Sequence, residues 1–270
     1  VTFFATGEEK YTDLLKELER AEHFIFLEYF IINQGEVWDH VLEILERKAK
    51  AGVEVRVMYD GMCALVSLPY RYPQQLRERG IKAKMFSPIK PLLSTHQNNR
   101  DHRKIAVIDG RVAYNGGINL ADEYMNIKKR FGHWKDTAVL LRGDAVQSLT
   151  MIFLQMWDVD MRGVEPYGKY LTKKADTLNE KLGYVIPYAD SPFDHENVGE
   201  EETYIDCIYY LLENIQDIDS KSTLENVLLN KQICPYCCEK LKKIEGTEFY
   251  EIGEQLIQEK IVTYYCPNCD

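Results

Sequence analysis

The sequence predicts an α/β fold in which helices cover a mixed β-sheet, followed by a small C-terminal module built around cysteines. Three observations support this prediction. Apolar strand-like segments alternate with amphipathic helical segments through the first part of the chain. The 270 residues are 45% hydrophobic, which is enough for one or two domains with a real core. Four of the seven cysteines form two Cys-Pro-x-Cys pairs near the C-terminus.

Helices are expected where apolar residues recur every three or four positions, and strands where apolar residues run together or alternate. Gly52 and Gly80 each end a helical pattern. Strand and helix patterns that alternate favour a parallel or mixed sheet. In chain order, the pattern predicts a helix over Glu8–Glu22, a strand over Phe24–Ile32, a helix over Val37–Ala51, a strand over Val53–Tyr59, a helix over Pro73–Arg79 and a strand over Lys82–Phe86.

The segment Ser87–Arg100 has no periodicity and predicts a long loop, which inside a compact domain is often functional. Two short apolar strands follow, Ile105–Ile108 and Val112–Tyr114, joined by a tight Asp-Gly turn. Beyond them the pattern predicts a short helix over Leu120–Asn126, a strand over Trp134–Leu141, a helix over Asp144–Trp157, a strand over Gly183–Pro187 and helical segments within Tyr204–Asn230.

His102 and Lys104 stand two positions apart at the start of the first of these short strands. Their side chains therefore leave the same face of the strand. A neutral imidazole can attack an electrophile while a neighbouring ammonium stabilises the negative charge that develops there. The pair therefore indicates attack on a phosphodiester, whose oxygens a lysine and an asparagine amide can hold.

The surrounding pattern, His-x-Lys-x4-Asp-x6-Gly-Gly-x-Asn, runs from His102 to Asn119. It resembles the signature of the phospholipase D superfamily. The flanking segments resemble bacterial cardiolipin synthase, and the likeness extends from about residue 1 to about residue 204; these segments are Phe26–Phe30, Gly52–Arg56, Gly116–Tyr124 and Phe131–Thr137. The resemblance implies a phospholipase D-like catalytic domain over residues 1–165.

The resemblance also implies a phosphatidyltransferase that makes cardiolipin from two phosphatidylglycerol molecules by ping-pong transfer. One histidine becomes phosphorylated, and a second protonates the leaving alcohol. His102, Lys104 and Asp109 are the implied catalytic residues, with Asp109 as a structural partner near the turn or simply a turn residue. No cofactor is expected for this catalysis.

The phosphoryl oxygens are expected to bind at Asn119 and Gly117, the latter because glycine lets the backbone approach a ligand closely. Asp136 lies where the family places an acidic residue that orients a histidine. Glu28, inside an apolar strand, is expected either to orient a catalytic group in the same way or to pair with a nearby lysine or arginine.

One signature is present, whereas the mechanism needs two. Two chains could face each other across a twofold axis, a second catalytic half could supply the other histidine, or the chain could be an inactive lipid- or protein-binding relative. A homodimeric phospholipase D-type phosphodiesterase or nuclease is a further alternative. The net charge of −10 makes nucleic acid an unlikely partner.

The C-terminal cysteines form a zinc-ribbon pattern, because two Cys-x-x-Cys pairs can bring four thiolates to one tetrahedral point. Cys234, Cys237, Cys266 and Cys269 are the expected ligands of a structural zinc ion. Residues Phe249–Ile252 and Ile261–Tyr265 predict a hairpin between the pairs. Residues 166–205 are expected to form a connector and the start of a truncated second half, and residues 206–270 a helical segment with the zinc-ribbon-like module.

No apolar run is long enough to span a bilayer. Because bacterial cardiolipin synthases carry transmembrane helices ahead of this point, the resemblance implies that an anchor is missing from the chain. The expected partners are phosphatidylglycerol or another phospholipid and a membrane surface. The implied location is the cytoplasmic face of a bacterial cell membrane.

Overall fold

The computed structural model describes residues 1–89, 100–130, 132–159, 165–171, 185–189, 204–208, 210, 212, 240, 242–252, 255–265 and 267. The chain divides into two compact units, Val1–Phe193 and Asp194–Asp270. All of the predicted catalytic and phosphate-binding residues lie in the first unit.

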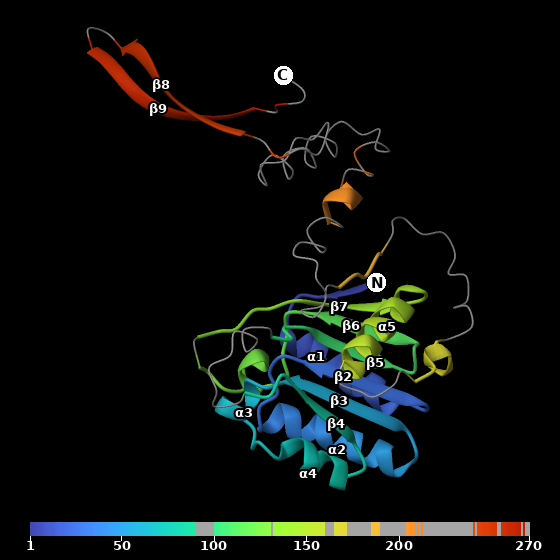
Figure 1. The fold of residues 1–270 in the computed structure, drawn as a ribbon. Helices are drawn as coiled ribbons and strands as arrows, with labels where there is room; N and C mark the ends of the chain where they lie inside the picture. Colours follow the sequence, from blue (N-terminus) through green and yellow to red (C-terminus); the bar gives the residue numbers. More distant parts are fainter. Residues whose placement is uncertain are drawn as a thin grey trace. The chain divides into compact units, whose positions relative to one another are not determined.

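Seven strands of the first unit form one mixed sheet in the order β1-β7-β6-β5-β2-β3-β4 (Figure 1). β2, β3 and β4 are parallel to one another, and the remaining neighbours are antiparallel. The mixed α/β sheet is therefore confirmed. The strands are β1 (Thr2–Phe4), β2 (Phe24–Tyr29), β3 (Glu54–Asp60), β4 (Lys82–Phe86), β5 (Lys104–Ile108), β6 (Val112–Gly116) and β7 (Ala138–Arg142).

Helices cover both faces of this sheet (Figure 1). One core contains the apolar sides of α1 and α2, and the other contains the apolar side of α5. The helical elements are α1 (Gly7–Glu19), α2 (Glu36–Lys50), α3 (Cys63–Val66), α4 (Tyr72–Glu78), η2 (Asp122–Met125), α5 (Ala145–Asp158) and η3 (Tyr167–Lys169).

β2 is buried along its whole length because each face of the sheet has its own core. Ile25, Leu27 and Tyr29 pack under α1 and α2, whereas Phe24 and Phe26 pack under α5. Side chains alternate along a strand, so Glu28 shares the side of Phe24 and Phe26. A carboxyl group is thereby placed inside the sheet, one residue before the strand ends.

Several predicted boundaries differ from the structure. β2 ends at Tyr29 rather than Ile32, and β7 begins at Ala138 rather than Trp134. The predicted helix over Leu120–Asn126 is the 3₁₀-helix η2. Within the predicted strand Gly183–Pro187, residues 185–187 are described and are not in a strand. β1 and α3 were not predicted.

In the second unit, β8 (Lys242–Ile252) and β9 (Gln255–Tyr265) form an antiparallel hairpin. The predicted hairpin between the cysteine pairs is confirmed and is longer than expected. Lys242 pairs with Tyr265, so the chain enters and leaves the hairpin at the same end. The four predicted zinc ligands lie outside the described residues, as does most of Tyr204–Asn230, of which residues 204–208 are helical.

Candidate active site

The candidate site forms where β5 begins and β2 ends, on neighbouring strands. Tyr29 pairs with Lys104 in the antiparallel register, and the N–H of Phe30 donates to the carbonyl of Arg103 at 3.0 Å. The chain just before β5 is therefore fixed against the chain just after β2. His102 lies in this fixed stretch, two residues before the strand proper.

The His102 side chain is exposed, and its ring centroid lies 4.6 Å from that of Phe30. Partial burial lowers the pKa of His102 below its ordinary value, and the charge of Lys104 adds to this effect. The imidazole is consequently neutral near pH 7 and open to an incoming group. Both properties are required of a nucleophilic histidine.

Lys104, by contrast, is buried, and its ammonium group donates to the backbone carbonyl of His102. Lys104 Nζ also lies 5.2 Å from the centroid of the Phe30 ring, so this ring contacts both members of the pair. Burial lowers the pKa of Lys104 to about 8, while Asp101 and Asp136 oppose the shift. Lys104 is therefore cationic at neutral pH in a poorly solvated position, where its charge acts strongly on a nearby anion.

Asn119 is buried, and its Oδ1 accepts the N–H of Ile31 at 2.8 Å, one residue after Phe30. That bond fixes the orientation of the amide, whose Nδ2 carries the N–H donors that a phosphoryl oxygen accepts. The structure thus places Asn119 against the same segment after β2 that carries the Phe30 ring.

Gly117 and Asp136 lie in close contact. A Cβ atom at Gly117 would lie 2.1 Å from Asp136 Oδ1, so a larger residue there would displace the Asp136 side chain. The N–H of Gly117 also donates to the carbonyl of Thr137 at 3.0 Å. Because the Asp136 charge raises the pKa of Lys104, its carboxylate lies within electrostatic reach of the site.

Asp109 is not brought to this site. It lies at the opposite end of β5, in the turn to β6, with φ of 55°. Its carboxylate accepts three backbone N–H groups, from Glu22 at 2.9 Å and from His23 and Phe24 at 2.8 Å. These contacts fit the expectation that Asp109 is a structural partner near the turn, because they join the turn to the chain entering β2 and not to His102 or Lys104.

Glu28 is fully buried behind the strand end, with Arg103 Nη1 3.4 Å from its Oε1. This contact fits the expectation that Glu28 pairs with a nearby lysine or arginine, while its role in orienting a catalytic group stays a prediction. Sequence reasoning missed two further buried acids here. Asp101 directly precedes His102, and Asp60 ends β3, where its Oδ2 accepts the N–H of Asp101 at 2.9 Å. The position of Asp60 at the end of a buried strand was the available signal.

A cavity of about 510 Å³ adjoins the Phe30 ring. Its walls come from the segment after β2, from the start of α3, from η2 and from the chain after η2, including Cys63, Glu123 and Lys128. His102, Lys104 and Asn119 are not among the residues that line it, but Phe30, which contacts His102, is.

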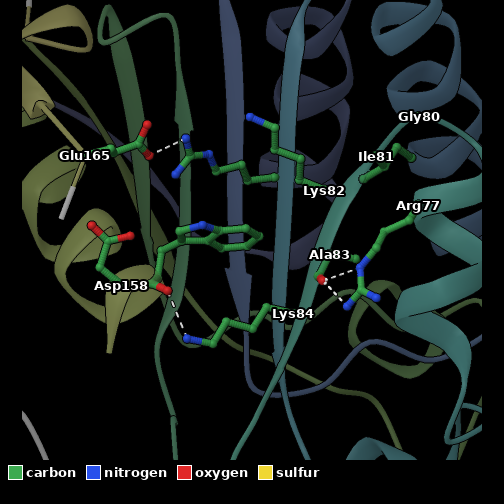
Figure 2. Close-up of a pocket in the computed structure, with 10 residues that line it drawn as sticks. Arg77, Gly80, Ile81, Lys82, Ala83, Lys84, Asp158 and Glu165 are labelled. Carbon is green, nitrogen blue, oxygen red and sulfur yellow. Dashed lines mark hydrogen bonds and ion pairs between the residues drawn. The ribbon is translucent and has the colours of Figure 1, made fainter. Parts of the chain in front are cut away.

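Figure 2 shows a second cavity, of about 620 Å³, at the far end of β3 and β4. Its charged groups are engaged internally. Arg56 pairs with Glu54 at 2.7 Å and with Glu165, and Lys84 Nζ donates to the carbonyl of Trp157 at 2.9 Å. None of the predicted catalytic residues lines it. Its contacts hold the chain after α5 against the sheet.

The model of the family described as "Cardiolipin synthase, PLD-like domain" matches residues 14–157 of this chain. The chain belongs to this family. A protein of Streptococcus mutans described only as uncharacterized is 56% identical over 208 residues, which cover 77% of this chain and 44% of the relative. A cardiolipin synthase of Geobacillus kaustophilus is 45% identical over 152 residues, which cover 56% of this chain and 30% of the relative.

Among solved structures, a phosphatidylserine synthase of Haemophilus influenzae matches with a TM-score of 0.48 and 16% identity, over 64% of this chain and 39% of that one. This likeness is too weak to carry an argument. The chain spans less than half the length of the relatives that it matches. In the part of the chain that the structure describes, no helix has the length and apolar character needed to cross a bilayer.

Proposed function

We propose that this chain supplies the phosphoryl-accepting half of a phosphatidyltransferase that makes cardiolipin from two phosphatidylglycerol molecules. The observation that carries the proposal is the exposed His102 imidazole, neutral near pH 7, beside the buried cation of Lys104. The similarity of residues 14–157 to the cardiolipin synthase family supports the choice of substrate.

In the first step, a ring nitrogen of His102 attacks phosphorus, a nitrogen–phosphorus bond forms and the bond to glycerol oxygen breaks. Lys104 and the Asn119 amide stabilise the charge on the phosphoryl oxygens. Glycerol leaves with a proton from a general acid. In the second step, the hydroxyl of another phosphatidylglycerol loses a proton and attacks phosphorus, which releases His102 and forms cardiolipin.

The general acid is a second imidazole from another copy of this chain or from a second catalytic half. Among the described residues, no other histidine contacts His102. Mixing experiments distinguish the two sources. If a twofold dimer forms the site, adding His102→Ala chain to wild-type chain should lower the activity, because each mixed dimer lacks one of the two histidines. The loss should follow the fraction of wild-type chain that is in mixed dimers. If a separate half is needed, chain alone stays inactive, at any concentration, until that half is added.

The direct test is formation of cardiolipin and free glycerol from phosphatidylglycerol vesicles, together with trapping of the phosphorylated enzyme by a denaturing quench at alkaline pH. Wild-type chain, with its second half if required, should give product and a mass increase located on His102. His102→Ala should give neither, whereas His23→Ala, an exposed histidine at the other end of the sheet, should behave like wild type. Equal product from wild type and His102→Ala would refute the proposal, and phosphatidic acid in place of cardiolipin would identify a phosphodiesterase.

The face around the cavity beside Phe30 is the proposed membrane-facing surface. Lys128 lines this cavity and is exposed, as is its neighbour Lys129, in a chain whose net charge is −10. Exposed Ile127, next to them, and exposed Leu65, on α3, add apolar surface. Cations mixed with apolar side chains suit a bilayer that contains anionic lipid, such as phosphatidylglycerol.

Sedimentation with phosphatidylglycerol vesicles tests this surface. The Lys128→Glu/Lys129→Glu variant should bind at least about 25-fold more weakly, because each of the two lost cations contributes about fivefold and the glutamates add repulsion. Lys16→Glu/Lys50→Glu makes the same change of charge on α1 and α2 and should bind like wild type. Equal weakening in both variants would show that only net charge matters and would refute this surface. We also propose that the protein acts at the cytoplasmic face of the membrane and that its C-terminal module is a zinc ribbon.

A further inference from the structure

Two buried carboxyl groups behind His102 each have an oxygen that lacks a donor. Among the described residues, Glu28 Oε2 and Asp101 Oδ2 have no hydrogen-bond donor. Glu28 is 0% exposed and Asp101 is 3% exposed, so water does not satisfy these oxygens. An ionised carboxylate left this way in a buried position is strongly unfavourable.

The two carboxyl groups are neighbours, because Arg103 contacts both of them and each acts on the pKa of the other. A hydrogen bond between them would satisfy both oxygens. Two ionised carboxylates can only accept, so such a bond requires a proton on one of them. One shared proton would give both unsatisfied oxygens a hydrogen-bond partner, because one carboxyl group would donate the proton and the other would accept it.

The charged groups around the pair are compatible with one proton on it. Three buried carboxyl groups, those of Glu28, Asp60 and Asp101, meet two guanidinium groups. Arg100 lies 3.3 Å from Asp60, and Arg103 lies 3.4 Å from Glu28. Next to the pair, Lys104 donates to the carbonyl of His102 and is also acted on by the Asp136 charge, while the His102 imidazole is neutral near pH 7.

Glu28 is the member that carries the proton. Asp101 Oδ1 already accepts the N–H of Arg103 at 3.2 Å, a contact that favours an ionised Asp101. Burial raises the pKa of Glu28 well above its usual range, and the charge of Asp101 raises it further. Burial also raises the pKa of Asp101, but Glu28 and the charge of Arg103 oppose that shift.

The pair fixes the backbone on both sides of His102. Asp101 is bound through its N–H to Asp60 and through its carboxylate to the N–H of Arg103, and the carbonyl of Arg103 accepts from Phe30. Side-chain alternation places Glu28 and Arg103 on the opposite face from His102 and Lys104. These hydrogen bonds therefore fix the backbone that carries the exposed His102 imidazole.

We propose that Glu28 and Asp101 share one proton in a carboxylic acid–carboxylate hydrogen bond, and that this pair positions the backbone that presents His102. Its bearing on catalysis rests on the function proposed above, whereas the shared proton does not. Glu28 and Asp101 are positioning residues, since neither touches the proposed reacting atoms.

The proton predicts a specific dependence of stability on pH. The pKa of Glu28 is higher in the folded chain than in the unfolded chain, so folding loses stability as pH rises from the unfolded pKa toward the folded pKa. In that window the unfolding equilibrium constant should increase about tenfold for each pH unit. Glu28→Gln keeps a neutral donor of the same shape and should lack this increase. The ratio of the unfolding constant of wild type to that of Glu28→Gln should therefore rise about tenfold for each pH unit in that window.

Urea unfolding of full-length chain at several values between pH 5 and 8 measures this ratio. Glu17→Gln is the matched control, because Glu17 is also a buried glutamate paired with arginines but its pKa is lowered. Since Glu17 is ionised in both states throughout this range, its variant should differ from wild type by a constant factor. A constant factor for Glu28→Gln as well would overturn the shared proton.

Two further measurements keep the proposal open to refutation if Glu28→Gln does not fold. Infrared spectra of wild-type chain at pH 7 should contain the C=O band of a buried protonated carboxylic acid, and its absence would overturn the proposal. For positioning, Glu28→Leu should lower kcat by roughly tenfold or more with KM little changed, and Glu28→Gln should restore kcat to within roughly threefold of wild type. Equal kcat in Glu28→Leu and wild type would refute the positioning role but leave His102 as the nucleophile.

Discussion

Replacement of Asp109 tests whether this residue of the signature acts in the chemistry or in the fold. Its carboxylate accepts three backbone N–H groups from residues 22–24, and its φ of 55° is a left-handed conformation that alanine disfavours. A hydrogen bond to a charged group contributes about 1.5–3 kcal/mol when it is shielded from water. Only the contact to Phe24 is partly buried, while those to Glu22 and His23 are exposed and can be replaced by water.

The expected losses follow from this geometry. Asp109→Ala should lose about 2 kcal/mol from the Phe24 contact, about 1 kcal/mol from the exposed contacts together and about 1 kcal/mol from backbone strain, or about 4 kcal/mol in all. Asp109→Gly tolerates the positive φ and should recover part of the strain. Asp109→Asn keeps one oxygen and tolerates the backbone, so it should lose about 1–2 kcal/mol.

Urea unfolding measures these losses, and trapping of phosphorylated His102 measures the chemistry in the same samples. At a temperature where each variant remains folded, all three should label His102 at a rate close to that of wild type. If a folded Asp109→Asn chain labelled as poorly as His102→Ala, Asp109 would act in the reaction, and the structural role assigned to it would be wrong.

The kcat/KM of the proposed transfer should give a bell-shaped pH profile, rising through the lowered pKa of His102 and falling near pH 8 as Lys104 loses its proton; Lys104→Arg should remove the alkaline fall. Burial lowers the pKa of Lys10 to about 7, so the stability of the folded chain should decrease as pH falls from the pKa of unfolded lysine toward 7. Lys10→Met removes this buried charge and also the hydrogen bond from Lys10 to Tyr29. In urea titrations at pH 7, the substitution should raise the unfolding free energy by roughly 1–3 kcal/mol. Metal analysis should find one zinc ion per chain, and serine at any one of the four proposed ligands should abolish it; these are Cys234, Cys237, Cys266 and Cys269.

The sequence was a reliable guide to the sheet because its strands carry strong local signals. β2 and β5 are buried apolar runs, and the positive φ of Gly52 ends the helix before β3 as expected. β1 was missed because three residues at a sheet edge have no periodicity. β7 starts later than predicted because Trp134 exchanges two hydrogen bonds with the Asn126 side chain instead of pairing in the sheet.

The site was predictable only where chemistry follows from close spacing along the chain. His102 and Lys104 are two residues apart, so strand geometry alone places them together. The partnership of Glu28 with Asp101 depends on the register between β2 and β5, which no local pattern specifies. Asp109 was correctly placed in the turn after β5, because a fixed spacing of five residues after Lys104 spans the strand and leads to its far end.

Charge at the strand end explains why a neutral Glu28 would matter to an anionic substrate. Arg100, Arg103 and Lys104 supply three cations, and the acids around them are Asp60, Asp101, Asp136 and Glu28. With Glu28 protonated, the described residues at this strand end supply three carboxylates and three cations, so their charges balance. An ionised Glu28 would add one negative charge near the place where a phosphodiester must bind, in a poorly solvated region where repulsion is weakly screened. The chain as a whole carries −10, so the approach of an anion to His102 depends on this local balance.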